Sequence, residues 1–163
     1  MSSASDDRAL GDAAEQFYAQ FMQAPTGRRH YQLDSRVREC DYSDCERMLV
    51  YLNAHADQPL AKAMCESVAI IQRVLQKSDR VAISFNGGKD ATVVLHLARL
   101  VSLMEARERE NMTPHGFFKQ HFTSFVIHND PQFREVAQFF VWADQEYNLN
   151  TTIYAGATFR ECI

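Results

Sequence analysis

Long apolar runs are missing from this chain of 163 residues. A transmembrane helix needs about 18 or more consecutive apolar residues, and no stretch of the sequence approaches that length. The opening residues, Met1–Asp7, also lack the basic start and apolar stretch of a secretory signal, and they carry acid where a mitochondrial presequence is basic. We therefore expect a soluble, cytoplasmic protein with no membrane partner.

The chain also lacks an excess of basic residues. It has 17 Lys and Arg against 21 Asp and Glu, which gives a formal net charge of -4. Proteins that bind nucleic acid usually present a basic patch, so we expect no nucleic-acid partner. A nucleotide ligand is still compatible with this charge, because one phosphate group needs only a local set of donors.

Cysteine is scarce and irregularly spaced. None of the four cysteines forms the CxxC pair that is typical of zinc sites; they are Cys40, Cys45, Cys65 and Cys162. In a cytosolic protein such residues are expected to be reduced thiols. The sequence therefore predicts neither a disulfide framework nor a structural zinc ion.

The part of the chain before residue 80 has helical patterning. Residues 8–22 have apolar positions at helical spacing, and residues 28–41 are polar and mixed, which indicates a loop. Ser43 or Asp44 can cap a helix that runs through His55. Pro59 lies near the start of a further helix, expected over 60–77.

The periodicity changes to that of strands after residue 79. Residues 80–85 are short, β-branched and apolar, as in a buried strand, and 90–107 follow as an amphipathic helix. The positions of that helix expected to face inward are Val93, Val94, Leu97, Leu100, Val101 and Met104. The later elements are a linker at 111–116, a strand at 122–128, a helix at 131–147, a strand at 151–154 and a helical start at 158–163.

Strands that alternate with helices through short connections predict right-handed crossovers and a parallel sheet. Ligands of such sheets bind beyond the carboxyl ends of the strands. The segments 86–90 and 128–131 both follow the carboxyl end of an expected strand. We therefore expect the two segments to open on one crevice, where His128 and Asn129 could contact a nucleoside.

The segment Ser84-Phe85-Asn86-Gly87-Gly88-Lys89-Asp90 has the parts of a phosphate-binding loop. The two glycines allow backbone angles that other residues avoid and let an anion approach the amides. The following helix directs its unpaired amides at the same point. Lys89 adds a positive charge, Asn86 a neutral donor, and Asp90 a carboxylate that can hold a divalent metal bridging phosphate oxygens. These parts suit the pyrophosphate of a bound nucleotide.

The loop is not a Walker A motif, which has Ser or Thr after its Lys, and it is not a GxGxxG fingerprint. It resembles the phosphate loop of the adenine nucleotide α-hydrolase superfamily, whose usual form is Ser-Gly-Gly-Lys-Asp-Ser. The aromatic-Asn pair before the glycines, with Thr92-Val93-Val94-Leu95-His96-Leu97 after them, resembles the eukaryotic FAD synthetases, which are FMN adenylyltransferases. The later segments 125–130, 133–136 and 147–149 are similar to the same family.

This resemblance implies a three-layer α/β fold with a parallel, Rossmann-like sheet and N-terminal helices. It implies an N-terminal helix and loop at 1–41 and a single nucleotide-binding domain at 42–163. It also implies the transfer of AMP from ATP to FMN with Mg²⁺, giving FAD and pyrophosphate. Asn86 and Asp90 would be catalytic, with Asp90 on the metal. The implied ATP-binding residues are Ser84, Phe85, Asn86, Gly87, Gly88, Lys89, Asp90, Thr92, His128 and Asn129.

The sequence departs from the family in two places. Residues 130–134 read Asp-Pro-Gln-Phe-Arg where the family tends to have Ser-Pro-Phe-Pro. The later Gly-Thr-Arg-Arg loop and Asn-Pro…Asp-Trp segment of the family have no counterpart before Ile163, so we expect a fold truncated at its C-terminus. Two alternatives stay open, a phosphoadenylylsulfate reductase-like enzyme that uses Cys162 and a non-catalytic nucleotide-binding module. The residues do not predict the oligomeric state.

Overall fold

The computed structural model describes residues 29–32, 40–129 and 133–162, together with Asp12, Glu15 and Ala19. The helix expected over 8–22 lies almost wholly outside the described residues, as does the turn at 130–132. No helix of the described part is both long and apolar enough to cross a membrane.

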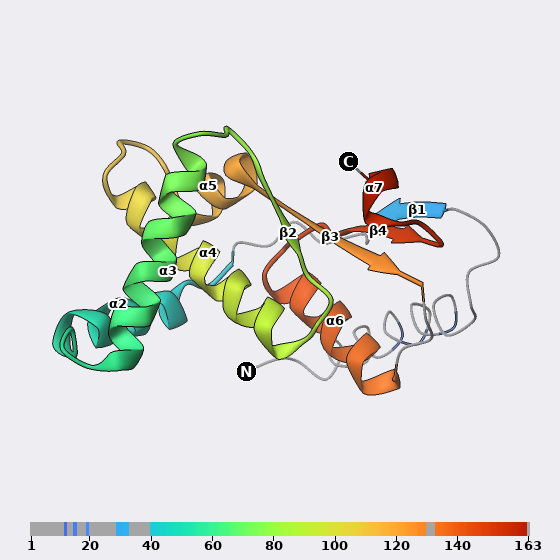
Figure 1. Ribbon diagram of the computed structural model, residues 1–163, viewed down its shortest axis with the longest axis horizontal. Coiled ribbons are helices and arrows are strands. Elements are labelled where there is room, and N and C mark those ends of the chain that lie inside the picture. Colours follow the sequence, from blue (N-terminus) through green and yellow to red (C-terminus); the bar gives the residue numbers. More distant parts are fainter. Residues whose placement is uncertain are drawn as a thin grey trace. The chain divides into compact units, whose positions relative to one another are not determined.

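The described elements make a mixed α/β structure (Figure 1). In chain order they are β1 (Arg29–Gln32), α2 (Ser43–Ala54), α3 (Pro59–Leu75), β2 (Val81–Ser84), α4 (Lys89–Arg107), α5 (Pro114–His121), β3 (Phe122–His128), α6 (Arg134–Glu146), β4 (Thr152–Ala155) and α7 (Phe159–Cys162). The sheet has the order β1-β4-β3-β2, and β2, β3 and β4 form its parallel part. The expected strand, helix and strand succession from residue 80 onward is thus confirmed, as is the helical start near residue 158.

The first strand of the sheet, β1, corrects the loop expected over 28–41. It runs antiparallel to β4, with Arg29 opposite Ala155 and Gln32 opposite Thr152. Its four residues, Arg-His-Tyr-Gln, show no apolar alternation. The strand therefore depends on pairing with a segment more than a hundred residues away, which a local pattern does not reveal.

Helix α5 corrects the linker expected over 111–116. The Thr113 hydroxyl accepts a hydrogen bond of 3.0 Å from the backbone N–H of Gly116, and Pro114 occupies the first helical position. Proline is favoured at that position because its missing N–H would be unpaired there anyway. The Pro and Gly that indicate a linker by composition here belong to the capped start of a helix.

The chain divides into two compact units. The helical unit comprises Glu39–Ile83 and Asp90–Thr123, and the loop unit comprises Ser84–Lys89 and Ser124–Ile163 with the N-terminal residues. In the helical unit, one face each of α2, α3 and α4 meets in an apolar core; its buried members are Cys45, Leu52, Ala61, Val68, Leu97, Leu100, Val101 and Leu103. Proline at the start of α3 again favours a helix at that point.

The inward positions expected on α4 are partly wrong. Val93 and Val94 are 57% and 47% exposed, whereas Leu95 is fully buried. The polar residues Arg99 and Ser102 are buried as well. Helix α4 therefore buries two faces rather than one apolar stripe, and a hydrophobic pattern marks only one of them.

Candidate functional site

The turn between β2 and α4 is held in shape by its own side chain. Gly87 has a φ of 77°, in the left-handed region that favours glycine. The backbone N–H of Gly88 donates to the side-chain oxygen Oδ1 of Asn86 at 2.9 Å. A Cβ on Gly88 would lie 3.0 Å from that same oxygen. Gly87 is thus favoured by its backbone angle and Gly88 by the close approach of the Asn86 side chain, which folds over the turn.

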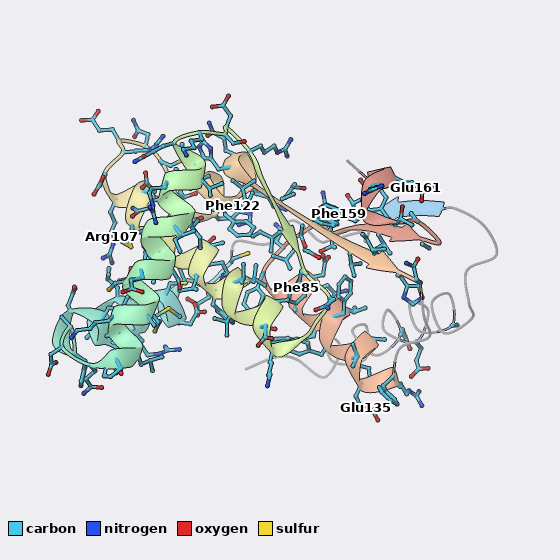
Figure 2. The ribbon with its side chains drawn as sticks, in the orientation of Figure 1. Phe85, Arg107, Phe122, Glu135, Phe159 and Glu161 are labelled. Carbon is cyan, nitrogen blue, oxygen red and sulfur yellow. The ribbon has the colours of Figure 1, made fainter. Side chains whose placement is uncertain are left out.

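Phe85 joins the turn to the sheet. Its N–H donates to the carbonyl of Phe125 at 2.8 Å, which continues strand pairing one residue past β2. Its ring is fully buried and stacks on Phe140 of α6 at 5.6 Å between centroids. Figure 2 shows Phe85 where β2 ends. The side chain and N–H of this predicted ATP-binding residue are therefore engaged within the protein.

Helix α6 also lies close to the turn. A Cβ built on Gly87 would come 3.5 Å from Phe139 and 3.7 Å from Val136. These two side chains of α6 therefore lie against the turn at Gly87. The sequence carries no signal for this support, because it depends on how α6 packs.

Helix α4 begins at Lys89, directly after the turn. The first N–H groups of a helix have no partner inside the helix and carry the positive end of its dipole. Lys89 and Asp90 stand in this first turn and are exposed, as is Asn86. Thr92 follows and is partly buried. Backbone donors, an ammonium group and a carboxylate are thus gathered within a few residues.

The carboxyl end of β3 holds the other predicted site residues. The carbonyl of His128 accepts from the N–H of Gly156 at 3.1 Å, and the Asn129 side chain donates to the carbonyl of Ala157 at 3.2 Å. His128 is buried and Asn129 is exposed. Because β2, β3 and β4 are parallel neighbours, the turn after β2 and the ends of β3 and β4 share one sheet edge.

The segment after β4 also belongs to this edge; its helical start was expected from the sequence, but the place of Gly156 beside His128 was not. Gly156 has a φ of 65°. The hydroxyl and N–H of Thr158 both donate to the Glu161 carboxylate, at 3.0 and 2.8 Å. The Glu161 side chain thus reaches back to the N–H of Thr158, as in one half of a capping box, and the spelling Thr-Phe-Arg-Glu is its signal in the sequence.

A second polar cluster lies in the helical unit. Arg99, 2% exposed, donates to Asp44 at 2.5 Å and to the Asp41 carbonyl, and its guanidinium stacks on the Tyr42 ring. His96 lies 3.0 Å from Asp44. These contacts join the start of α2 to the middle of α4. The cluster therefore links the two helices.

The cluster shifts the pKa values of its members. Burial opposes ionisation of Asp44, but the hydrogen bonds and charge of Arg99 outweigh it and hold the pKa of Asp44 below its ordinary value. Burial, helped by the Arg99 charge, lowers the pKa of His96. Burial raises the pKa of the Cys45 thiol to about 12, so this cysteine is not a nucleophile at neutral pH.

Comparison with known proteins finds relatives that are all described as FAD synthases. No family model and no solved structure matches the chain. Probable FAD synthases of Caenorhabditis briggsae and Caenorhabditis elegans are each 33% identical to it over 93 residues, or 56% of this chain. The match covers 16% of the length of each relative. The chain is therefore a distant homologue of the FAD synthases, linked to them at the level of the family.

Proposed function

We propose that the segment Ser84–Asp90 binds the phosphates of ATP and that the protein serves the transfer of AMP from ATP to FMN. In this reaction a phosphate oxygen of FMN attacks the α-phosphorus of ATP. The bond from that phosphorus to the bridging oxygen breaks, and pyrophosphate leaves. The observation that carries the proposal is the glycine turn that leads from a parallel strand directly into the start of α4.

Asn86 is the proposed stabiliser of the α-phosphate. Its Oδ1 accepts from the Gly88 N–H, so the NH₂ end of the amide is the end left to donate to a ligand. The turn thereby fixes the orientation of the amide before a substrate arrives. Charge stabilisation by a donor already in place needs little reorganisation during the reaction.

Lys89 and the first amides of α4 are the proposed contacts of the β- and γ-phosphates. Asp90 would hold Mg²⁺, and phosphate oxygens and water would complete its coordination, as is usual for magnesium on nucleotides. No group of three or more possible metal ligands occurs among the described residues. The ion would therefore bind together with ATP, not in a cage built by these residues.

We assign the remaining predicted residues to contacts with the adenosine and with a phosphate of the nucleotide. Ser84 and the Phe85 carbonyl would border the adenosine from β2, and His128 and Asn129 from β3. Thr92 would donate its hydroxyl to a phosphate. The strand order of the sheet supports a fold of the adenine nucleotide α-hydrolase type, which we propose for this chain. We also propose a cytoplasmic location.

Calorimetry with ATP and Mg²⁺ tests the loop. We expect the double variant Lys89→Ala/Asp90→Ala to bind ATP at least about tenfold more weakly, because it loses a cation and a metal ligand at the phosphates. The matched control is Asp57→Ala/Lys62→Ala, which removes one exposed acid and one exposed base elsewhere. Unchanged ATP affinity in the loop variant would show that the loop assignment is wrong.

A second candidate is a nucleotide-binding module without catalysis. The same glycine turn and helix start would serve it, because they can bind phosphates whether or not a transfer follows. Incubation of the purified chain with FMN, ATP and Mg²⁺ distinguishes the two. We expect FAD and pyrophosphate in equal amounts if the chain catalyses the transfer. Binding of ATP without FAD would favour the module instead.

A further inference from the structure

Helix α3 carries two rows of apolar residues, although it needs only one to join the core. The inner row packs with α2 and α4 in the core of the helical unit; its members are Ala61, Met64, Val68, Ile71 and Leu75. One such row is what an amphipathic helix needs for a single buried face. The attachment of α3 is therefore explained without its other apolar residues.

The outer row consists of Leu60, Ala63, Ser67, Ile70 and Val74, spaced by three and four residues. Leu60, Ile70 and Val74 are 60%, 53% and 41% exposed. The Ser67 hydroxyl donates to the Ala63 carbonyl at 2.8 Å, so the polar group in the row already has a partner. The row is thus an apolar stripe along most of α3, and such stripes are typical of helix pairing.

The outer row of α3 is complementary to the outer row of a second copy when the two α3 helices run antiparallel. A two-fold axis midway between Ser67 and Ile70 places Ile70 opposite Ser67 of the second copy and Val74 opposite its Ala63. Both of these layers set a large side chain against a small one, which lets two helices interlock closely. Leu60 falls opposite Lys77, beyond the end of α3, and adds no further layer. A parallel pair would set Ile70 against Ile70 and Val74 against Val74.

Charges beside the outer row favour the same arrangement. Glu66 and Arg73 are exposed and lie seven residues apart, on the flank of the outer row that faces away from the inner row. In the antiparallel pair Glu66 meets Arg73 of the second copy, and the reverse contact repeats across the axis. A two-fold interface of this kind uses the same patch on both copies.

We propose that the outer row of α3 is the docking surface for a second copy of this chain, with the two α3 helices antiparallel. One helix pair buries less than the roughly 1,200 Å² of a standard interface. We therefore expect a weak and reversible association. None of these residues belongs to the phosphate loop, so this surface is independent of the proposed function.

Sedimentation over a range of protein concentrations tests the surface. We expect a reversible monomer–dimer equilibrium for the wild type and only monomer for Ile70→Glu. Because Ile70 is exposed in the monomer, the variant should keep its circular dichroism spectrum and melting temperature. Val50→Glu is the matched control: Val50 is 67% exposed on α2, outside the outer row, and its change should leave the dimer intact.

Charge reversal tests the antiparallel pairing itself. Glu66→Arg and Arg73→Glu should each weaken the dimer, because each variant brings like charges together. The double variant Glu66→Arg/Arg73→Glu should recover it. An equimolar mixture of the two single variants should form a heterodimer, since one then presents two arginines and the other two glutamates. A wild type that stays monomeric at every concentration would overturn the proposal. So would a double variant, or a mixture of the two single variants, that does not dimerise.

Discussion

At the scale of single residues, the sequence predicts the glycine turn at Gly87 but not the side chains that pack against it. The glycines, Lys89 and Asp90 are local features that can be read directly from the sequence. The packing of Phe139 and Val136 on Gly87 joins residues about fifty positions apart, and no local pattern contains it. The ion pair of the buried Arg99 with the partly exposed Asp44 was unpredictable for the same reason.

Gly87→Ala tests the backbone of the turn. A Cβ at this position has ordinary van der Waals room, so the cost comes from the φ of 77°. We expect a loss of about 1 kcal/mol in the free energy of unfolding, measured with urea, and weaker ATP binding. Gly87→Asn should cost less, because asparagine tolerates this region, as Asn111, Asn148 and Asn150 do here. An alanine variant as stable as the wild type would contradict the turn geometry.

At the scale of elements, strands β2 and β3 and helices α2, α3 and α6 follow from local patterns. Strand β1 does not, because its pairing partner β4 supplies its stability. Helix α5 was hidden because its proline and glycine, read as chain breakers, lie in a capped helix start. Helix α4 was found, but its second buried face mixes Leu95, Ala98 and Ala106 with the polar Arg99 and Ser102, so the expected apolar positions do not include it.

The link between α2 and α4 predicts how stability depends on pH. The pKa values of His96 and Asp44 are lower in the folded chain than their ordinary values of 6.5 and 3.8. The unfolded chain therefore binds more protons as the pH falls, and acid favours unfolding. We expect the free energy of unfolding to fall as the pH drops below about 6.5, and to fall again below about 3.8.

Urea titrations at several pH values measure this dependence. His96→Gln removes the group that titrates first, so its stability should be flatter between about pH 7.5 and pH 5 than that of the wild type. His55→Gln serves as the control, because this histidine lies at the other end of α2. Equal slopes for the wild type and His96→Gln would argue against a folded-state shift at His96.

At the scale of the whole molecule, the sequence predicts a mixed α/β fold, which the structure shows, and a resemblance to FAD synthetases, which the comparisons support as a distant homology. Residue patterns indicated the parallel strands and the phosphate loop. They did not indicate that the N–H of Gly156 would bond to the carbonyl of His128, because this contact appears only once β4 lies beside β3. Nor does the sequence show that Leu60, Ile70 and Val74 of α3 are exposed, because apolar residues of both rows recur at helical spacing.

The most direct measurement of the central claim is the binding of ATP compared with AMP, both with Mg²⁺, by calorimetry. AMP lacks the β- and γ-phosphates that the loop is proposed to bind. The wild type should bind ATP at least about tenfold more tightly than AMP, which is about 1.4 kcal/mol. Lys89→Ala/Asp90→Ala should lose most of that difference. Equal affinities for ATP and AMP in the wild type would contradict phosphate binding by the loop.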